Sequence, residues 1–221
     1  MILIKKKNEP KELEKYRNTP GVDYQAIPEL VESLLNEQGY ICAYCMRRIP
    51  HQDKILKGTI EKPTDEKHRV EHIQSREKHD DKKLEYKNMV ICCPGHIGDE
   101  DHCDRLKGSR DLSFSPLDPN FIATLSYSTD GTIKSSTPRY DKEINEVLNL
   151  NTKLLKQNRK AKWDAVLAQL KALHKGEDWK KSTLRKALSK YSEMHDEGGV
   201  SKHEPYCGIV MYFLDKKLRQ F

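Results

Sequence analysis

Apolar residues recur at helical spacing in four parts of the chain, and this pattern predicts a mainly helical protein. The four predicted helices cover residues 28–38, 144–170, 182–194 and 206–218. Pro28 suits the first turn of the first helix, and Ser182 or Thr183 is a candidate N-cap for the third. The last segment is apolar on one face, so we expect it to pack against the body of the protein.

Shorter apolar stretches predict strands between these helices, so the expected fold class is α+β. The candidate strands are residues 2–4, 69–73 and 89–92, the last of which could instead begin a helix. A β-hairpin is predicted within residues 122–135, because Asp130-Gly131 supplies the positive φ angles of a tight turn. The polar residues 50–69 have no strong period and predict a loop or loose hairpin.

The chain is polar and basic, with 33% charged residues, 36% hydrophobic residues and a net charge of +6. The hydrophobic share is sufficient for a buried core, so global disorder is not expected. Residues 141–190 hold thirteen Lys and Arg against six Asp and Glu, a surplus of seven. This surplus fits binding to a polyanion such as DNA, but it equally fits solvated helix faces packed against a partner.

No apolar run has the length of a signal peptide or of a membrane-spanning helix. We therefore expect a cytoplasmic protein that does not enter a membrane. Six cysteines are expected to stay reduced in that compartment, which favours thiolate–metal chemistry over disulfides.

The spacing of the cysteines predicts a structural zinc site. The predicted ligands are Cys42, Cys45, Cys93 and Cys103. The first two form a CxxC knuckle that presents both sulfurs to one tetrahedral ion, and the nine residues between the last two must loop out. Cys92 and His102 each adjoin a predicted ligand and remain rivals for its place.

Polar residues inside this cysteine frame predict hydrolytic chemistry. Glu71 and His72 are adjacent in a predicted strand, so their side chains would point to opposite sides, one toward a metal ion and the other toward a water molecule. Asp104 follows the last cysteine where a helix begins, a position at which an acid is favoured and can bind a hard cation.

The order of these residues resembles that of the HNH, or ββα-metal, endonucleases of the zinc-stapled kind. The resemblance implies that His72 is the general base and that Asn88 positions it through the loop backbone. It further implies that Glu71 and Asp104 hold a catalytic Mg²⁺ or Mn²⁺ ion, in place of the family's usual Asp and His or Asn. Lys107-Gly108 matches the basic pair that closes the motif, and DNA contacts are expected from Lys107 and Arg105.

Flanking features extend the resemblance over nearly the whole chain. These features are the arm with Pro10, the approach to Cys42, the segment around Asp118, the Asp130-Gly131 hairpin, and Leu148 to Asn151 with Arg159 downstream. They are similar to the PtuB nucleases of the Septu anti-phage system and their retron-associated relatives. The resemblance implies an effector that acts on DNA together with a PtuA-like ATPase subunit.

We therefore expect a zinc-stapled HNH nuclease core flanked by two extensions. The expected parts are an N-terminal arm and helix (1–37), the nuclease core (38–112), and a C-terminal hairpin with helices (113–221). The open alternative is a non-catalytic, zinc-dependent DNA-binding or adaptor subunit. Such a protein would have no need for an acid–His pair at Glu71 and His72.

Overall fold

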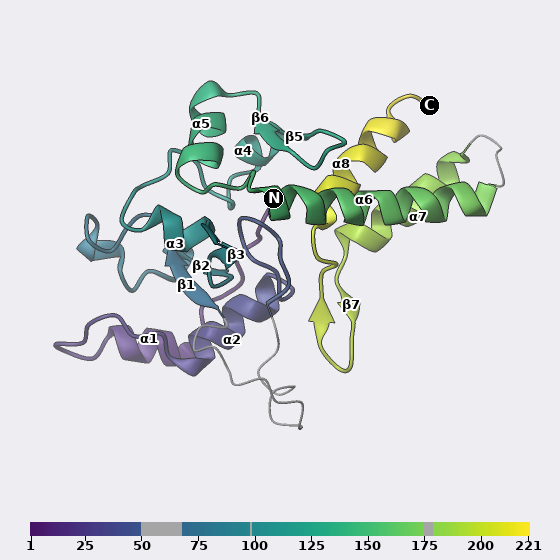
Figure 1. Ribbon diagram of the computed structural model, residues 1–221. Helices are drawn as coiled ribbons and strands as arrows, with labels where there is room; N and C mark the ends of the chain where they lie inside the picture. Colours follow the sequence, from purple (N-terminus) through teal and green to yellow (C-terminus); the bar gives the residue numbers. More distant parts are fainter. Residues whose placement is uncertain (50–67, 98, 175–178) are drawn as a thin grey trace.

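The computed structural model describes residues 1–49, 68–97, 99–174 and 179–221 (Figure 1). Within these ranges the fold is α+β, with helices predominating and every sheet made of two strands. The predicted loop at 50–69 lies almost entirely outside the described residues. No described helix is both long and apolar enough to cross a membrane.

Two short antiparallel strands and a short helix, here called the central strands and helix from their place in the chain, lie in the left half of Figure 1. Strand β1 (Arg69–His72) pairs with β2 (Met89–Cys92), with Glu71 opposite Val90. Helix α3 (Cys103–Lys107) follows after a small hairpin of β3 (His96–Ile97) and β4 (Glu100–Asp101). Both predicted strands are confirmed, and residues 89–92 are a strand rather than a helix start because they pair along the whole length of β1.

Helix α2 (Pro28–Glu37) packs beside β2 and confirms the first predicted helix. Its apolar stripe is buried, and Gln38 immediately after it pairs with the strand. The Gln38 side chain donates to Ile91 O (2.9 Å) and accepts from Ile91 N (2.7 Å). This side chain therefore satisfies backbone groups at the edge of β2 that no further strand covers.

The N-terminal arm differs from the prediction in two ways. Residues 2–4 are not a strand, since Ile4 N instead donates to Pro116 O (3.0 Å) in a loop. Residues Lys11–Arg17 form an unpredicted helix, α1, after Pro10. Its single buried residue, Leu13, gave too weak an apolar pattern to predict a helix.

Within the described residues, the C-terminal half adds two hairpins and most of the helical content. Its elements are α4 (Pro119–Ala123), β5 (Leu125–Tyr127), β6 (Ile133–Ser135), α5 (Pro138–Glu146), α6 (Lys153–His174), α7 (Lys181–Ser192), β7 (His195–Asp196), β8 (Ser201–Lys202) and α8 (Cys207–Leu218). The hairpin around Gly131 (φ 88°) is confirmed. It starts later than predicted because Asp118 caps α4 by accepting a hydrogen bond from Asn120 N (2.9 Å).

Two helix predictions in this half need correction. The predicted continuous helix over 144–170 is broken between α5 and α6, where Asn149 adopts a φ of 46°. Helix α7 begins at Lys181 after Lys180, so neither Ser182 nor Thr183 is its N-cap. The apolar last segment forms α8 and packs against α7 and α6, as expected.

One hydrophobic core runs through all three predicted parts of the chain. Backbone hydrogen bonds also join them: Cys103 N donates to Leu148 O (2.8 Å), and Tyr206 N donates to Met46 O (3.0 Å). The central strands and helix are therefore packed into the C-terminal half rather than linked to it by a tether.

Arg159 connects the β5–β6 hairpin to the turn between α5 and α6. Its side chain is only 1% exposed. The guanidinium donates to Gly131 O (2.6 Å), to Leu150 O (2.8 Å) and to Asn151 Oδ1 (3.1 Å). Arg159 thus links the Asp130-Gly131 turn to Leu150 and Asn151.

Candidate functional site

Four cysteine sulfurs meet beside the central strands. The residues are Cys42, Cys45, Cys93 and Cys103, and their sulfurs all lie within 4.8 Å of one another. The distance is 3.8 Å between Cys42 and Cys103, and 3.6 Å between Cys45 and Cys93. Tetrahedral zinc with bonds of about 2.3 Å places its sulfurs about 3.8 Å apart. The predicted cysteine group is confirmed as a set that could hold a metal ion such as zinc.

Local backbone geometry brings these sulfurs together. The knuckle closes through hydrogen bonds from Met46 N to Cys42 O (3.0 Å) and from Cys42 N to Arg47 O (2.9 Å), with Met46 in the left-handed region. Ala43 N donates to Ile91 O (3.0 Å), which attaches the knuckle to β2. The CxxC turn is therefore held at a fixed position relative to the strand that leads into Cys93.

The two rivals for a ligand position lie outside this group. Cys92 is buried, but its sulfur does not belong to the group of four sulfurs that lie within 4.8 Å of one another. His102 Nδ1 lies 3.0 Å from Cys103 Sγ, within hydrogen-bond distance. His102 is therefore a hydrogen-bond partner of a ligand, the arrangement that commonly orients metal-bound residues.

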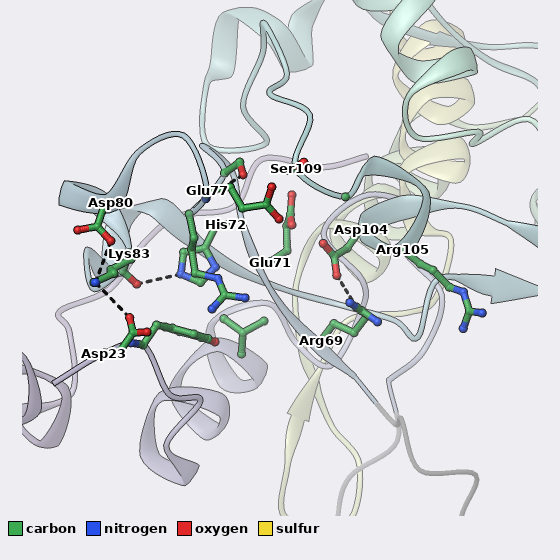
Figure 2. Close-up of a pocket in the computed structure, with 15 residues that line it drawn as sticks. Asp23, Arg69, Glu71, His72, Glu77, Asp80, Lys83, Asp104, Arg105 and Ser109 are labelled. Atoms are coloured by element: carbon green, nitrogen blue, oxygen red, sulfur yellow. Dashed lines mark hydrogen bonds and ion pairs between the residues drawn. The ribbon is translucent and has the colours of Figure 1, made fainter.

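A polar cleft of about 600 Å³ opens next to the cysteine group (Figure 2). Glu71, His72 and Asp104 all line it, together with Tyr24 from the loop before α2. Glu71 and His72, predicted to point to opposite sides of the strand, have different neighbours, since Glu71 contacts Tyr44 and Lys107 while His72 contacts Lys83 O and Tyr24, yet both line the cleft at the end of β1. Three of the four predicted catalytic residues are thus brought together.

His72 is held as a neutral imidazole with a defined tautomer. Its Nε2 lies 2.9 Å from Lys83 O, and since a carbonyl can only accept, Nε2 carries the hydrogen and Nδ1 keeps its lone pair. The ring makes an edge contact with Tyr24, with centroids 4.5 Å apart. Burial, assisted by the charges of Arg76 and Lys107, lowers the pKa of His72 to about 4.

Asn88 lies outside the cleft and holds the segment between the two strands. Its side chain accepts from Gln74 N (2.8 Å) and donates to Gln74 O (3.0 Å) and Lys82 O (3.2 Å). These bonds hold Gln74 and Lys82 in place. Lys83 follows Lys82 directly, and its carbonyl orients His72. Asn88 is therefore connected to His72 through the loop backbone, by way of Lys82 and the Lys83 carbonyl.

Glu71 is buried in the floor of the cleft with two donors on one oxygen. Tyr44 Oη donates to Glu71 Oε1 (2.8 Å), and Lys107 Nζ lies 2.8 Å from the same atom. Burial and a hydrogen bond shared with the Asp104 carboxyl raise the pKa of Glu71 well above its usual range. The two carboxyl groups are therefore close neighbours.

Lys107 occupies a different position from the one predicted. Its side chain is 0% exposed, and its Nζ also donates to His72 O (3.0 Å). A lysine buried beneath Glu71 cannot contact DNA from this position, so the proposed phosphate contact by Lys107 does not fit. The expectation came from the match of Lys107-Gly108 to the basic pair of the motif, which carries no information on burial.

Asp104 and Arg105 begin helix α3 but point in different directions (Figure 2). Arg69 Nε contacts Asp104 Oδ2 at 2.5 Å. Arg105 pairs with Asp101 at 2.9 Å and is partly exposed at the edge of the cleft, where it remains available to a ligand. Arg69 was not predicted as a site residue. It lies two residues before Glu71 in β1, so the two side chains are on the same face of the strand.

Comparison of the sequence with models of known families and with curated proteins found no match.

We expect Cys103→Ser to lower the zinc that the purified protein retains, because it removes one of four ligands from a tetrahedral site. Cys92→Ser is the matched control, since Cys92 is equally buried but lies outside the group. Metal analysis after dialysis gives the number of zinc ions per chain. Loss of zinc from Cys92→Ser with full retention by Cys103→Ser would contradict the ligand set.

We expect the imidazole of His72 to titrate with a pKa of about 4 in the zinc-loaded protein. Because this pKa lies below the ordinary 6.5, the folded state resists protonation. The free energy of unfolding should then fall as the pH drops from about 6.5 to about 4. NMR titration of the ring measures the pKa, and His72→Gln assigns the signal. A pKa of 6.5 or above would show that the ring is not buried as described.

Proposed function

We propose that this chain is a metal-dependent HNH endonuclease that hydrolyses phosphodiester bonds of DNA. The observation that carries the proposal is the cleft in which neutral, oriented His72 lies beside the paired carboxyls of Glu71 and Asp104. The three residues come from β1 and α3 of one strand–strand–helix unit next to the cysteine group. A zinc-binding module without catalysis has no use for this combination.

The residues of the cleft fit a hard divalent cation. Glu71 and Asp104 offer carboxyl oxygens, the kind of donor that Mg²⁺ and Mn²⁺ prefer, and an ion bound there would displace the proton that the raised pKa of Glu71 favours. Such an ion, when bound, would stabilise negative charge on the phosphate and on the leaving 3′ oxygen. Lys107 and Tyr44 keep Glu71 in place through their contacts with Oε1.

His72 is suited to accept a proton from the attacking water. The hydrogen on Nε2 is committed to Lys83 O, so Nδ1 is the acceptor. A pKa of about 4 keeps this nitrogen unprotonated at neutral pH, although it also makes the base weaker than an ordinary imidazole. Asn88 contributes by keeping Lys83 at hydrogen-bond distance, and so acts on the base without touching the substrate.

DNA attachment is proposed for the surface around the cleft and for the basic C-terminal helices. Arg105 stands at the edge of the cleft. Of the thirteen basic residues in 141–190, Arg159 is buried and serves the fold, which leaves a reduced but still positive surplus for phosphates. Binding of this kind is independent of sequence and weakens as salt rises.

We further propose that the chain is a cytoplasmic effector of an anti-phage system and acts with an ATPase subunit similar to PtuA. This part rests on the resemblance of the flanking segments to PtuB nucleases. The alternative of a non-catalytic adaptor would use the same cysteine group but would leave Glu71 and His72 without a chemical role.

His72→Ala should abolish plasmid nicking in Mg²⁺ or Mn²⁺ while zinc content stays at the wild-type level. Removal of a general base typically lowers the rate by about a hundredfold or more. His195→Ala is the control, because His195 is exposed and lies outside the cleft. A zinc-loaded His72→Ala protein that nicks at the wild-type rate would favour the adaptor over the nuclease.

Co-expression with the neighbouring genes of its operon tests the proposed partnership. We expect the chain to co-purify with an ATPase, and to cut weakly or indiscriminately without it. A free monomer that gives full protection against phage with no stable partner would contradict this part, and would leave the nuclease proposal intact.

A further inference from the structure

Arg76 places a guanidinium over an aromatic ring that lines the cleft. Its Cζ lies 4.4 Å from the centroid of the Tyr24 ring, and that ring packs edge-on against His72 with centroids 4.5 Å apart. All three residues line the cleft. The guanidinium therefore lies no farther from the imidazole than these two distances together allow, and so in the neighbourhood of the proposed base.

The absence of an acid partner distinguishes Arg76 from the other cationic side chains of the cleft. Arg69, Lys83 and Arg105 each pair with at least one aspartate. Within the part of the chain that the structure describes, the exposed side chain of Arg76 has neither an ion pair nor a hydrogen bond. Its contact with Tyr24 needs no acceptor atom, so the N–H donors of the guanidinium stay available to a ligand.

The chemistry of the guanidinium selects the kind of ligand. The group is planar and can donate two parallel hydrogen bonds to a phosphate, which a lysine ammonium cannot do. A phosphodiester held beside His72 would bring its phosphorus close to the water that the imidazole is proposed to deprotonate. Phosphate is therefore the ligand that fits both the donors of Arg76 and the neighbouring base.

We propose that Arg76 binds a phosphate oxygen of the DNA strand beside His72, and that the Tyr24 ring holds the guanidinium in place for this contact. The inference rests on the proposed nuclease function and adds a substrate-binding residue to it. Arg76 touches the substrate, whereas Tyr24 is a positioning residue that acts through the guanidinium. The contact requires no divalent ion, so it forms whenever DNA enters the cleft.

DNA binding without cutting gives the first test. The anisotropy of a labelled duplex is measured with the zinc-loaded protein over a series of salt concentrations, in the absence of Mg²⁺ and Mn²⁺. Arg76→Gln should reduce the slope of log K against log salt by about 1, because one phosphate contact is lost. Lys78→Gln is the matched control, since Lys78 pairs with Asp111 at 3.7 Å and does not line the cleft. It removes the same charge and should leave the slope unchanged.

Cleavage gives the second test. At saturating Mn²⁺, Arg76→Gln should cut about tenfold more slowly in single turnovers, the factor expected for loss of one charge-assisted hydrogen bond. Arg76→Lys keeps the charge without the planar fork, so its salt slope should match that of the wild type while its rate is intermediate. It also carries the test if Arg76→Gln fails to retain zinc.

The role of Tyr24 is tested through its ring. Tyr24→Phe keeps the aromatic face and should behave as the wild type, whereas Tyr24→Leu should weaken DNA binding about threefold although it removes no charge. Because Tyr24 acts on DNA through Arg76, the double variant of Tyr24→Leu with Arg76→Gln should bind DNA no more weakly than Arg76→Gln alone. Additive losses in the double variant would refute the positioning role.

The outcomes separate this inference from the proposed function. An unchanged salt slope in Arg76→Gln, beside a wild-type protein that binds and cuts DNA, would refute the phosphate contact and leave the nuclease intact. A reduced slope in Arg76→Gln, beside a wild-type protein that binds DNA but never cuts it even with its partner, would support the contact and favour the non-catalytic alternative. A wild-type protein that neither binds nor cuts DNA would overturn both.

Discussion

The convergence of four cysteine sulfurs is the constraint on which the rest of the structure depends. It joins the turn after α2, the end of β2 and the start of α3. Strand β2 and helix α3 are both short. Paired strands of four residues and a helix of five are not stable by themselves in water. A metal ion held by these sulfurs would supply the free energy that such a small unit lacks, and would fix the angle at which the helix meets the strands.

Burial of charge is the second organising feature, and it has a cost. Glu71 and Lys107 are both nearly inaccessible, and removal of charged groups from water is expensive unless every polar atom finds a partner. Tyr44 and the carbonyl of His72 provide those partners. The same contacts hold the Glu71 carboxyl and the backbone of His72 in fixed relative positions. These hydrogen bonds offset the free-energy cost of burying the charges and also define the geometry of the cleft.

Local patterns predicted the parts of the fold that depend on local information. The stripe on α2, the short strand β1 and the Asp130-Gly131 turn are all visible in short windows, and the cysteine spacing indicated the sulfur group. Residues whose environment is set by distant segments could not be predicted in this way. The break at Asn149 and the burial of Lys107 depend on long-range packing, and α1 has too few apolar residues to give a pattern.

The hydrogen bond from Cys103 N to Leu148 O joins the backbone of the C-terminal half to the residue that precedes Asp104 in the cleft. Leu148 lies in the turn that leads into α6, and α6 packs against α8. A load applied to those helices would pass through backbone atoms to the first residue of α3, one position before Asp104. The residue that precedes Asp104 is thus anchored by the C-terminal half, and a chain that ended after α3 would lose this backbone anchor beside the cleft.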